Sequence, residues 1–263
     1  MDKSLNNVES LEEYRYKKIL NKYLDTIVKR DDFMLKKQIY LDAKHICISY
    51  DLMKEELLLK VNIKKLNIEE NMLKSSISLN KKPNKEAINN LINKETLKLN
   101  NNILDIDNLL KASKEYIKDY EKSEEYKKEI SRLYKKMIFR ISPTFNNLDV
   151  NKEKLWRKTE LAYIYNNLDI LKVLSNLLNE NHTPTKTYTI EELIENTNKL
   201  NEEIQSMKNI YPFNVENKID NKDYIKSYRD EIKERIENLK EEQENLYTKV
   251  NLLKNEIKKL NLI

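Results

Sequence analysis

One periodic segment decides the fold: residues 222–260 read KDYIKSYRDEIKERIENLKEEQENLYTKVNLLKNEIKKL. Seam positions recur in it at alternating steps of three and four over five heptads, which is the pattern of an α-helix that packs along one seam. The pattern predicts a long helix that begins near residue 222. Its seam consists of Ile225, Ile232, Leu239, Leu246, Leu253 and Leu260 at heptad position d and of Arg229, Ile236, Gln243, Val250 and Ile257 at position a.

The charges beside this seam indicate what its partner is. β-Branched residues at position a with leucine at d favour a parallel two-stranded coiled coil, so the seam alone predicts a homodimer. In a parallel homodimer, however, Arg235 would face Lys240 and Lys249 would face Lys254. Each exposed repulsion costs only roughly 0.2–0.5 kcal/mol, which tilts the choice of partner without forbidding a dimer. We therefore expect an acidic partner or one within the chain, and a hetero-complex rather than a parallel homodimer.

The nearest seam within the chain lies just upstream. Its heptad positions are Ile190, Leu193, Thr197, Leu200, Ile204, Met207 and Tyr211. Folding back through Pro212 would bring Ile204 to Ile232, but this pairing uses only three heptads. The unpaired remainder either docks on the helix that contains Trp156 or binds another chain, because a row of branched apolar residues is not expected in water. We predict a protein-interaction site at Leu246, Val250, Leu253, Ile257 and Leu260.

The rest of the chain has the same helical period, and it contains no glycine. Without glycine the chain lacks the phosphate-binding loops of nucleotide-binding folds. A capping box at Ser10 predicts the first helix, Asp31 or Asp32 can cap a second start, and a helix follows to about residue 79. Asn80 suits a left-handed helix end, and Pro83 prevents continuation, so the chain reverses there.

The return arm of this hairpin extends from about 85 to 141, with a weak point at residues 100–102. The hairpin should bring Tyr50 near Lys114 or Ile117. We predict an all-α protein of elongated helical hairpins and coiled coil, with no substantial β-sheet. Its predicted regions are an N-terminal helix with a long basic hairpin (1–142), a central helix and loop (143–183) and a C-terminal coiled-coil hairpin (184–263).

Residues for catalysis or metal binding are scarce. Of the two histidines, His45 follows Asp42 at a spacing of three, and His182 lies in a loop without a comparable partner. Cys47 is the only cysteine, which excludes an internal disulfide and fits a reducing compartment. We interpret the adjacent carboxylates Glu55–Glu56 and Glu69–Glu70 as solvated helix faces. The sequence therefore predicts no catalytic residue, no metal, no cofactor and no enzyme activity.

A row of cations gives an alternative function. These are Lys128, Arg132, Lys135, Lys136 and Arg140, on one side of a helix beside Tyr134 and Phe139. Such a row can contact the phosphates of a nucleic acid, although cations near a helix C-terminus are also favoured by the helix dipole. The excess of basic residues falls in residues 1–142, and the whole chain has a net charge of +5.

The favoured interpretation is a structural or scaffolding coiled-coil subunit that binds other proteins through exposed helix seams. The alternative is an accessory subunit of a nucleic-acid-handling assembly that uses the basic hairpin. No apolar run approaches the roughly 20 residues needed to cross a bilayer, so we expect no membrane span. We expect an intracellular protein, in a compartment that the sequence does not specify.

Overall fold

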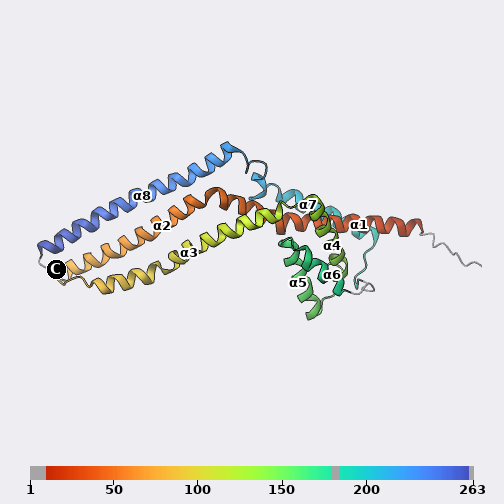
Figure 1. Cartoon of the computed structure of the whole chain (residues 1–263), viewed down its shortest axis with the longest axis horizontal. Coiled ribbons are helices and arrows are strands. Elements are labelled where there is room, and N and C mark those ends of the chain that lie inside the picture. Colours follow the sequence, from red (N-terminus) through yellow and green to blue (C-terminus); the bar gives the residue numbers. More distant parts are fainter. Residues whose placement is uncertain (1–9, 179–183, 261–263) are drawn as a thin grey trace, which may run out of the picture. The chain divides into compact units, whose positions relative to one another are not determined.

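The computed structural model describes residues 10–178 and 184–260, and this part of the chain is helical throughout its regular structure and contains no strand (Figure 1). The prediction of an all-α fold is confirmed. None of the described helices is long and apolar enough to cross a bilayer. The elements are α1 (Leu11–Asp31), a π-helix (Asp32–Lys37), α2 (Gln38–Ser78), α3 (Lys85–Tyr120), α4 (Glu124–Ile141), α5 (Val150–Ile164), α6 (Leu168–Leu177), α7 (Ile190–Met207), a 3₁₀ turn (Phe213–Val215) and α8 (Lys222–Lys259).

Helix ends follow the local rules of the sequence. The Ser10 hydroxyl accepts a hydrogen bond from the backbone N–H of Glu13, and the Glu13 carboxylate accepts one from the backbone N–H of Ser10. Thr189 and Glu192 form the same reciprocal pair at the start of α7. Asn80 has φ 49° just after α2, as predicted for a left-handed helix end in a chain without glycine.

Three helix boundaries differ from the prediction. Asp31 does not start a second helix, because its backbone is helical and the chain passes through a π-helical turn instead. The return arm is continuous at residues 100–102 and ends near Tyr120, and Ser123 then caps α4. The predicted central helix is divided at Asn166, which has φ 50°. The sequence signal for the breaks at Ser123 and Asn166 was weak because asparagine is common throughout the chain and serine also occurs inside helices.

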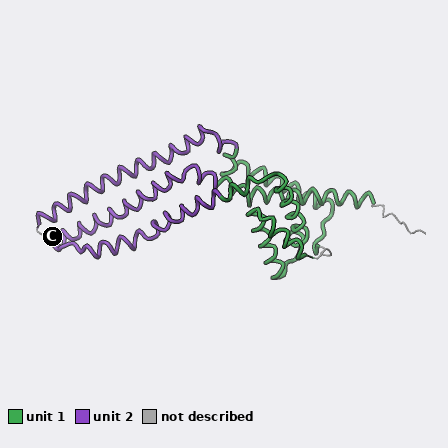
Figure 2. The backbone as a smooth tube through the Cα atoms, viewed as in Figure 1, with its two compact units in different colours: residues 1–42, 115–216 green, residues 43–114, 217–263 purple. Residues whose placement is uncertain are grey.

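The chain forms two compact units (Figure 2), of which unit 1 comprises residues 1–42 and 115–216. Each unit combines segments that are far apart in the sequence, whereas the predicted boundaries at 142 and 183 divide the chain into consecutive regions. The unit 1 core gathers apolar faces of α1, α4, α5, α6 and α7. Its centre is aromatic, since the rings of Tyr134 and Tyr163 stack with centroids 3.7 Å apart and Trp156 stacks on Tyr134.

Unit 2 comprises residues 43–114 and 217–263 and contains most of α2 and α3 together with α8. Ion pairs fix the helix directions. Arg229–Asp51 (2.6 Å) and Lys254–Glu69 (2.8 Å) advance together along the two helices, so α8 is parallel to α2. In contrast, Lys54–Asp107 (2.8 Å) and Lys64–Glu95 (3.7 Å) advance in opposite senses, so α3 is antiparallel to α2. Figure 1 shows the three helices lying lengthwise beside one another.

Two predicted pairings are therefore corrected. The Tyr50 hydroxyl donates to Asp107, so the hairpin exists with α3 shifted by roughly two turns relative to the predicted partners Lys114 and Ile117. Ile204 and Ile232 do not form a C-terminal coiled-coil hairpin, because α7 packs on α1 within unit 1 whereas Ile232 packs on α2 within unit 2. The seam of α2 is longer than that of α7, which gives α8 a partner for its whole length.

Candidate functional site

The predicted protein-interaction residues lie on the face of α8 that packs on α2. Val250 and Ile257 contact Leu73 of α2 and are 1% and 3% exposed, and Leu246 is also buried. The row was expected to dock on the helix that contains Trp156 or to bind another chain, and Val250 and Ile257 instead pack in one cluster with Leu66 and Leu73 of α2. Leu253 is half-buried, and Leu260 is 47% exposed. Binding of another chain at these five residues stays a prediction, and the covered ones would first have to separate from α2.

The basic residues beside this seam form ion pairs with carboxylates on α2. The Arg229 guanidinium donates to both carboxylate oxygens of Asp51 and to the carbonyl oxygen of Ile48, and these hydrogen bonds lower the pKa of Asp51. Lys240 pairs with Glu55 at 3.1 Å. The charge argument favoured an acidic partner or one within the chain, and the structure supplies a partner within the chain, α2, instead of the helix over residues 190–207. The interpretation of the Glu69–Glu70 pair as a solvated helix face is corrected, because Glu70 is only 7% exposed.

The predicted nucleic-acid contacts lie on α4 in unit 1. Lys128 and Arg132 are exposed, whereas the other three members of the row are half-buried. Arg132 forms a two-pronged ion pair with Glu129 and lowers the pKa of that carboxyl. Lys135 pairs with Asp25 at 2.6 Å. Carboxylates on the same unit thus already neutralise part of the row.

Two further observations weaken this row as a phosphate-binding surface. The Arg140 guanidinium donates to the carbonyl oxygen of Leu178 at 3.4 Å. Tyr134, which could have offered an aromatic ring to a base, is fully buried. The structure places this row in unit 1 and the predicted protein-interaction residues in unit 2, so the predicted residues fall into two separate sets.

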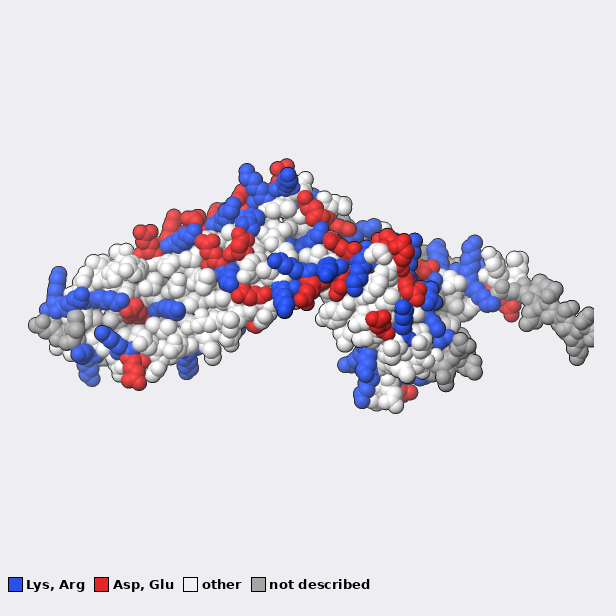
Figure 3. Space-filling model, viewed as in Figure 1, with Lys and Arg blue, Asp and Glu red and all other residues white. Residues whose placement is uncertain are grey.

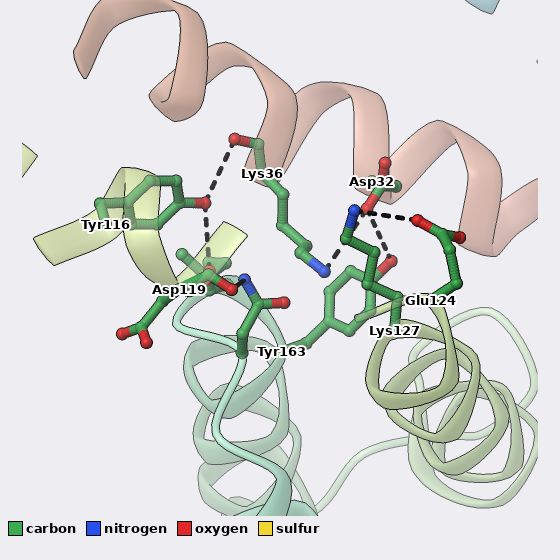
Figure 4. Close-up of polar contacts among 9 residues, drawn as sticks. Asp32, Lys36, Tyr116, Asp119, Glu124, Lys127 and Tyr163 are labelled. Carbon is green, nitrogen blue, oxygen red and sulfur yellow. Dashed lines mark hydrogen bonds and ion pairs between the residues drawn. The ribbon is translucent and has the colours of Figure 1, made fainter. Parts of the chain in front are cut away.

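A buried polar cluster at the π-helix was not predicted (Figure 4). The Lys36 ammonium lies 4.5 Å from the centroid of the Tyr163 ring and 3.5 Å from a carboxylate oxygen of Asp32. The Tyr116 hydroxyl lies 3.2 Å from the carbonyl oxygen of Lys36 and 3.1 Å from that of Ile164. The π-helical turn thus lies against the end of α3 and the end of α5, and such turns are frequent at functional positions.

The electrostatics of this cluster follow from burial. Lys36 is 4% exposed, and burial lowers the pKa of its ammonium, although the Asp32 carboxylate opposes the shift. Burial also raises the pKa of the Tyr163 hydroxyl well above its ordinary value. A lysine of lowered pKa can act as an amine nucleophile, but this one is covered by the Tyr163 ring and has almost no solvent access. In this conformation the cluster joins helices and does not offer the amine to a substrate.

A second buried charge sits one residue before the π-helix. The Asp31 carboxylate is 5% exposed, accepts a hydrogen bond from the Tyr134 hydroxyl at 2.9 Å and accepts two from the Arg30 guanidinium. Burial raises its pKa, and Arg30 partly offsets the shift. Asp31 and Asp32 were interpreted as helix caps. The sequence signal for this arrangement was the pair of aspartates followed by Lys36 about one turn later, a spacing at which opposite charges on a helix can pair.

The histidines and the cysteine form no metal site in the described part of the chain, where no group of three His, Cys, Asp or Glu side chains is placed to hold an ion. His45 is buried, with its Nε2 3.1 Å from the Tyr224 hydroxyl. Burial raises the pKa of the Cys47 thiol. His182 lies outside the described residues.

Comparison of the chain with known proteins finds no matching protein-family model, no matching curated protein and no matching solved structure.

Proposed function

We propose that the protein is a structural subunit of a larger complex that binds partner proteins through exposed helix faces. One observation carries the proposal. Leu97 and Leu104 lie seven residues apart on α3 and are 61% and 65% exposed, on the face opposite the buried Ile106. Two large apolar side chains at heptad spacing on the outside of a long helix are the pattern by which one helix receives another.

The surroundings of these leucines support the proposal. Their exposed neighbours on the outer face include the asparagines Asn90, Asn93, Asn101 and Asn108, while the charged Lys94 and Asp107 lie at its edges. In a chain with 35% charged residues, charges are thus sparse on this face, and much of the surface along α3 is uncharged in Figure 3. Charges are depleted at the centres of protein–protein interfaces. An amphipathic helix of another protein would bury both leucines, and the asparagine side chains would set its register.

A paired substitution tests this function. We expect Leu97→Asp combined with Leu104→Asp to abolish recovery of partner proteins from native cell extract, because a carboxylate in the centre of the contact would be buried without a pair. The matched control is Leu252→Asp, which alters a leucine on α8 that is 64% exposed. Quantitative mass spectrometry of captured proteins gives the readout, and circular dichroism checks that both variants stay helical. Equal recovery with the two variants would contradict the proposal.

The second candidate is a subunit that binds nucleic acid through α4, and one observation favours it. Lys128, Arg132 and Lys136 recur at one-turn intervals along the helix. It carries less weight because the Arg132–Glu129 ion pair and the Lys135–Asp25 ion pair would have to open. Binding of duplex DNA that weakens steeply as salt rises, and that Lys128→Glu with Lys136→Glu removes, would favour this candidate over the first.

A further inference from the structure

Unit 2 has a groove at the end where the α2–α3 turn meets the end of α8. The groove has a volume of about 490 Å³. Leu73 of α2, Ile88 of α3 and Ile257 of α8 line it together with Pro83 of the turn. Each of these three aliphatic residues is less than 9% exposed, so the apolar floor of the groove is largely covered. Its volume falls within the roughly 300–1,000 Å³ of clefts that accept ligand groups.

Lysines surround this floor. Lys82, Lys85, Lys254 and Lys258 line the groove beside a single carboxylate, Glu69. Glu69 is already paired with Lys254 at 2.8 Å. Among the described residues, no carboxylate lies within ion-pair distance of the other three lysines. Figure 3 shows basic side chains gathered at this end of unit 2. The lining therefore has a net formal charge of +3 around an apolar recess.

We propose that this groove binds an acidic segment of a partner protein that inserts a large apolar side chain between α2, α3 and α8. The lysines neutralise the aspartates and glutamates that flank the inserted side chain, and Leu73, Ile88 and Ile257 cover the side chain itself. This inference rests on the proposed function, because the partner is a protein, but it uses a surface other than the outer face of α3.

Charge and shape together favour a peptide over other anions. A nucleic acid would satisfy the lysines with its phosphates, but it has no aliphatic or aromatic side chain to fill the apolar recess. An anionic bilayer attracts lysines at its surface, whereas this floor lies recessed behind them. A peptide with carboxylates on both sides of one phenylalanine or leucine satisfies both the rim and the floor, as acidic motifs do in basic clefts.

Fluorescence anisotropy of the full chain with defined probes tests the proposal. The probe is a short fluorescein-labelled peptide of aspartates and glutamates around one phenylalanine, and the comparison peptide has serine in its place. We expect the serine peptide to bind at least about tenfold more weakly, which is the scale of burying one large apolar side chain. Equal binding of the two peptides would overturn the proposal.

Charge reversal localises the binding. Lys85→Glu with Lys258→Glu should weaken binding of the phenylalanine peptide by at least about tenfold. Lys98→Glu with Lys226→Glu changes the net charge equally at exposed lysines outside the groove and should leave binding nearly unchanged. Circular dichroism checks that both double variants remain helical. If the two double variants weakened peptide binding equally, the peptide would be attracted by net charge alone, and the assignment of binding to the groove would be overturned.

Two further binding measurements compare the peptide with other anions. Preferential binding of duplex DNA, or of phosphatidylserine vesicles, over the phenylalanine peptide would also overturn the proposal. Because the groove lies apart from Leu97 and Leu104 in sequence and in lining, its failure leaves the partner-capture experiment on α3 unaffected. The two proposals therefore fail separately.

Discussion

Unit 1 buries whole aromatic side chains, whereas unit 2 buries single rows of aliphatic ones. Among the described residues, the twelve largest fully buried side chains comprise eleven from unit 1 and one, Ile219, from unit 2. Unit 2 compensates with ion pairs that bridge α2 to α3 and to α8, such as Arg229–Asp51 and Lys54–Asp107. We infer that the stability of unit 1 depends on a packed centre, whereas that of unit 2 is spread along its helices.

The largest expected effect comes from alkaline pH. Burial raises the pKa values of Tyr134 and Tyr163, both 0% exposed. The unfolded chain releases these protons near pH 10 while the folded protein retains them, so the unfolded state binds fewer protons and stability falls as pH rises. Above pH 10, each tyrosine lowers the free energy of unfolding by roughly 1.4 kcal/mol per pH unit, and the two together lower it by about 5 kcal/mol at pH 12.

Two signals can follow this transition. Trp156 is the only tryptophan, and it stacks on Tyr134, so its fluorescence reports on unit 1. Far-UV circular dichroism reports on all helices. We expect the fluorescence to change at a lower pH than the remaining helical signal. Coincident transitions would show that the two units unfold as one, and ionisation of both hydroxyls near pH 10 in the still folded protein would contradict their burial.

The next effect is loss of a buried ring from unit 1. Tyr134→Ala should lower the free energy of unfolding by about 3–5 kcal/mol, because it leaves a cavity. It also removes a hydrogen-bond partner of the buried Asp31. Urea titration followed by Trp156 fluorescence measures the change. Tyr247→Ala is the control, since this α8 tyrosine is 59% exposed and should shift stability by no more than about 0.5 kcal/mol.

A seam substitution in unit 2 should have a smaller effect. Ile236 packs with Leu52 and Leu59 of α2, and Ile236→Ala should cost about 2–4 kcal/mol locally. Hydrogen exchange should accelerate in peptides of α2 and α8, while Trp156 fluorescence keeps its urea midpoint. A shifted fluorescence midpoint would mean that the units share their stability. Leu252→Ala, at an exposed position on the same helix, provides the comparison.

The smallest effect concerns the bridging charges. Arg229→Gln removes a two-pronged pair with the exposed Asp51, and such pairs contribute about 1 kcal/mol or less. The loss should shrink as salt is added, because screening already weakens the pair. Chemical denaturation with urea at two salt concentrations measures it. A loss that is large and independent of salt would show that Arg229 acts through packing instead.

Much of the fold could be predicted because helix period and caps are local. The two capping boxes and the turn at Asn80 were read correctly, and α8 begins at Lys222, where its seam predicted a start. The pairing of helices could not be predicted in the same way. Residues 190–207 and α2 both carry a heptad seam, and nothing local distinguishes a nearby antiparallel partner from a distant parallel one.

The sites were harder to predict than the fold. The groove floor combines Leu73, Ile88 and Ile257 from three helices, so no spacing in the sequence relates them. The polar cluster depends on the π-helical turn, which changes the faces on which Asp32 and Lys36 lie. The charges of α8 favoured an acidic partner or one within the chain, and several of them pair with carboxylates of α2.

The parallel pairing of α2 with α8 has a consequence for synthesis of the chain. Residues 79–221 separate the two helices, and a ribosome needs roughly 7–30 s to add these 143 residues at about 5–20 per second. During that interval Leu52, Leu59 and Leu73 have no α8 to cover them. We expect the nascent chain to be the form most prone to aggregation and to recruit chaperones until its last long helix emerges.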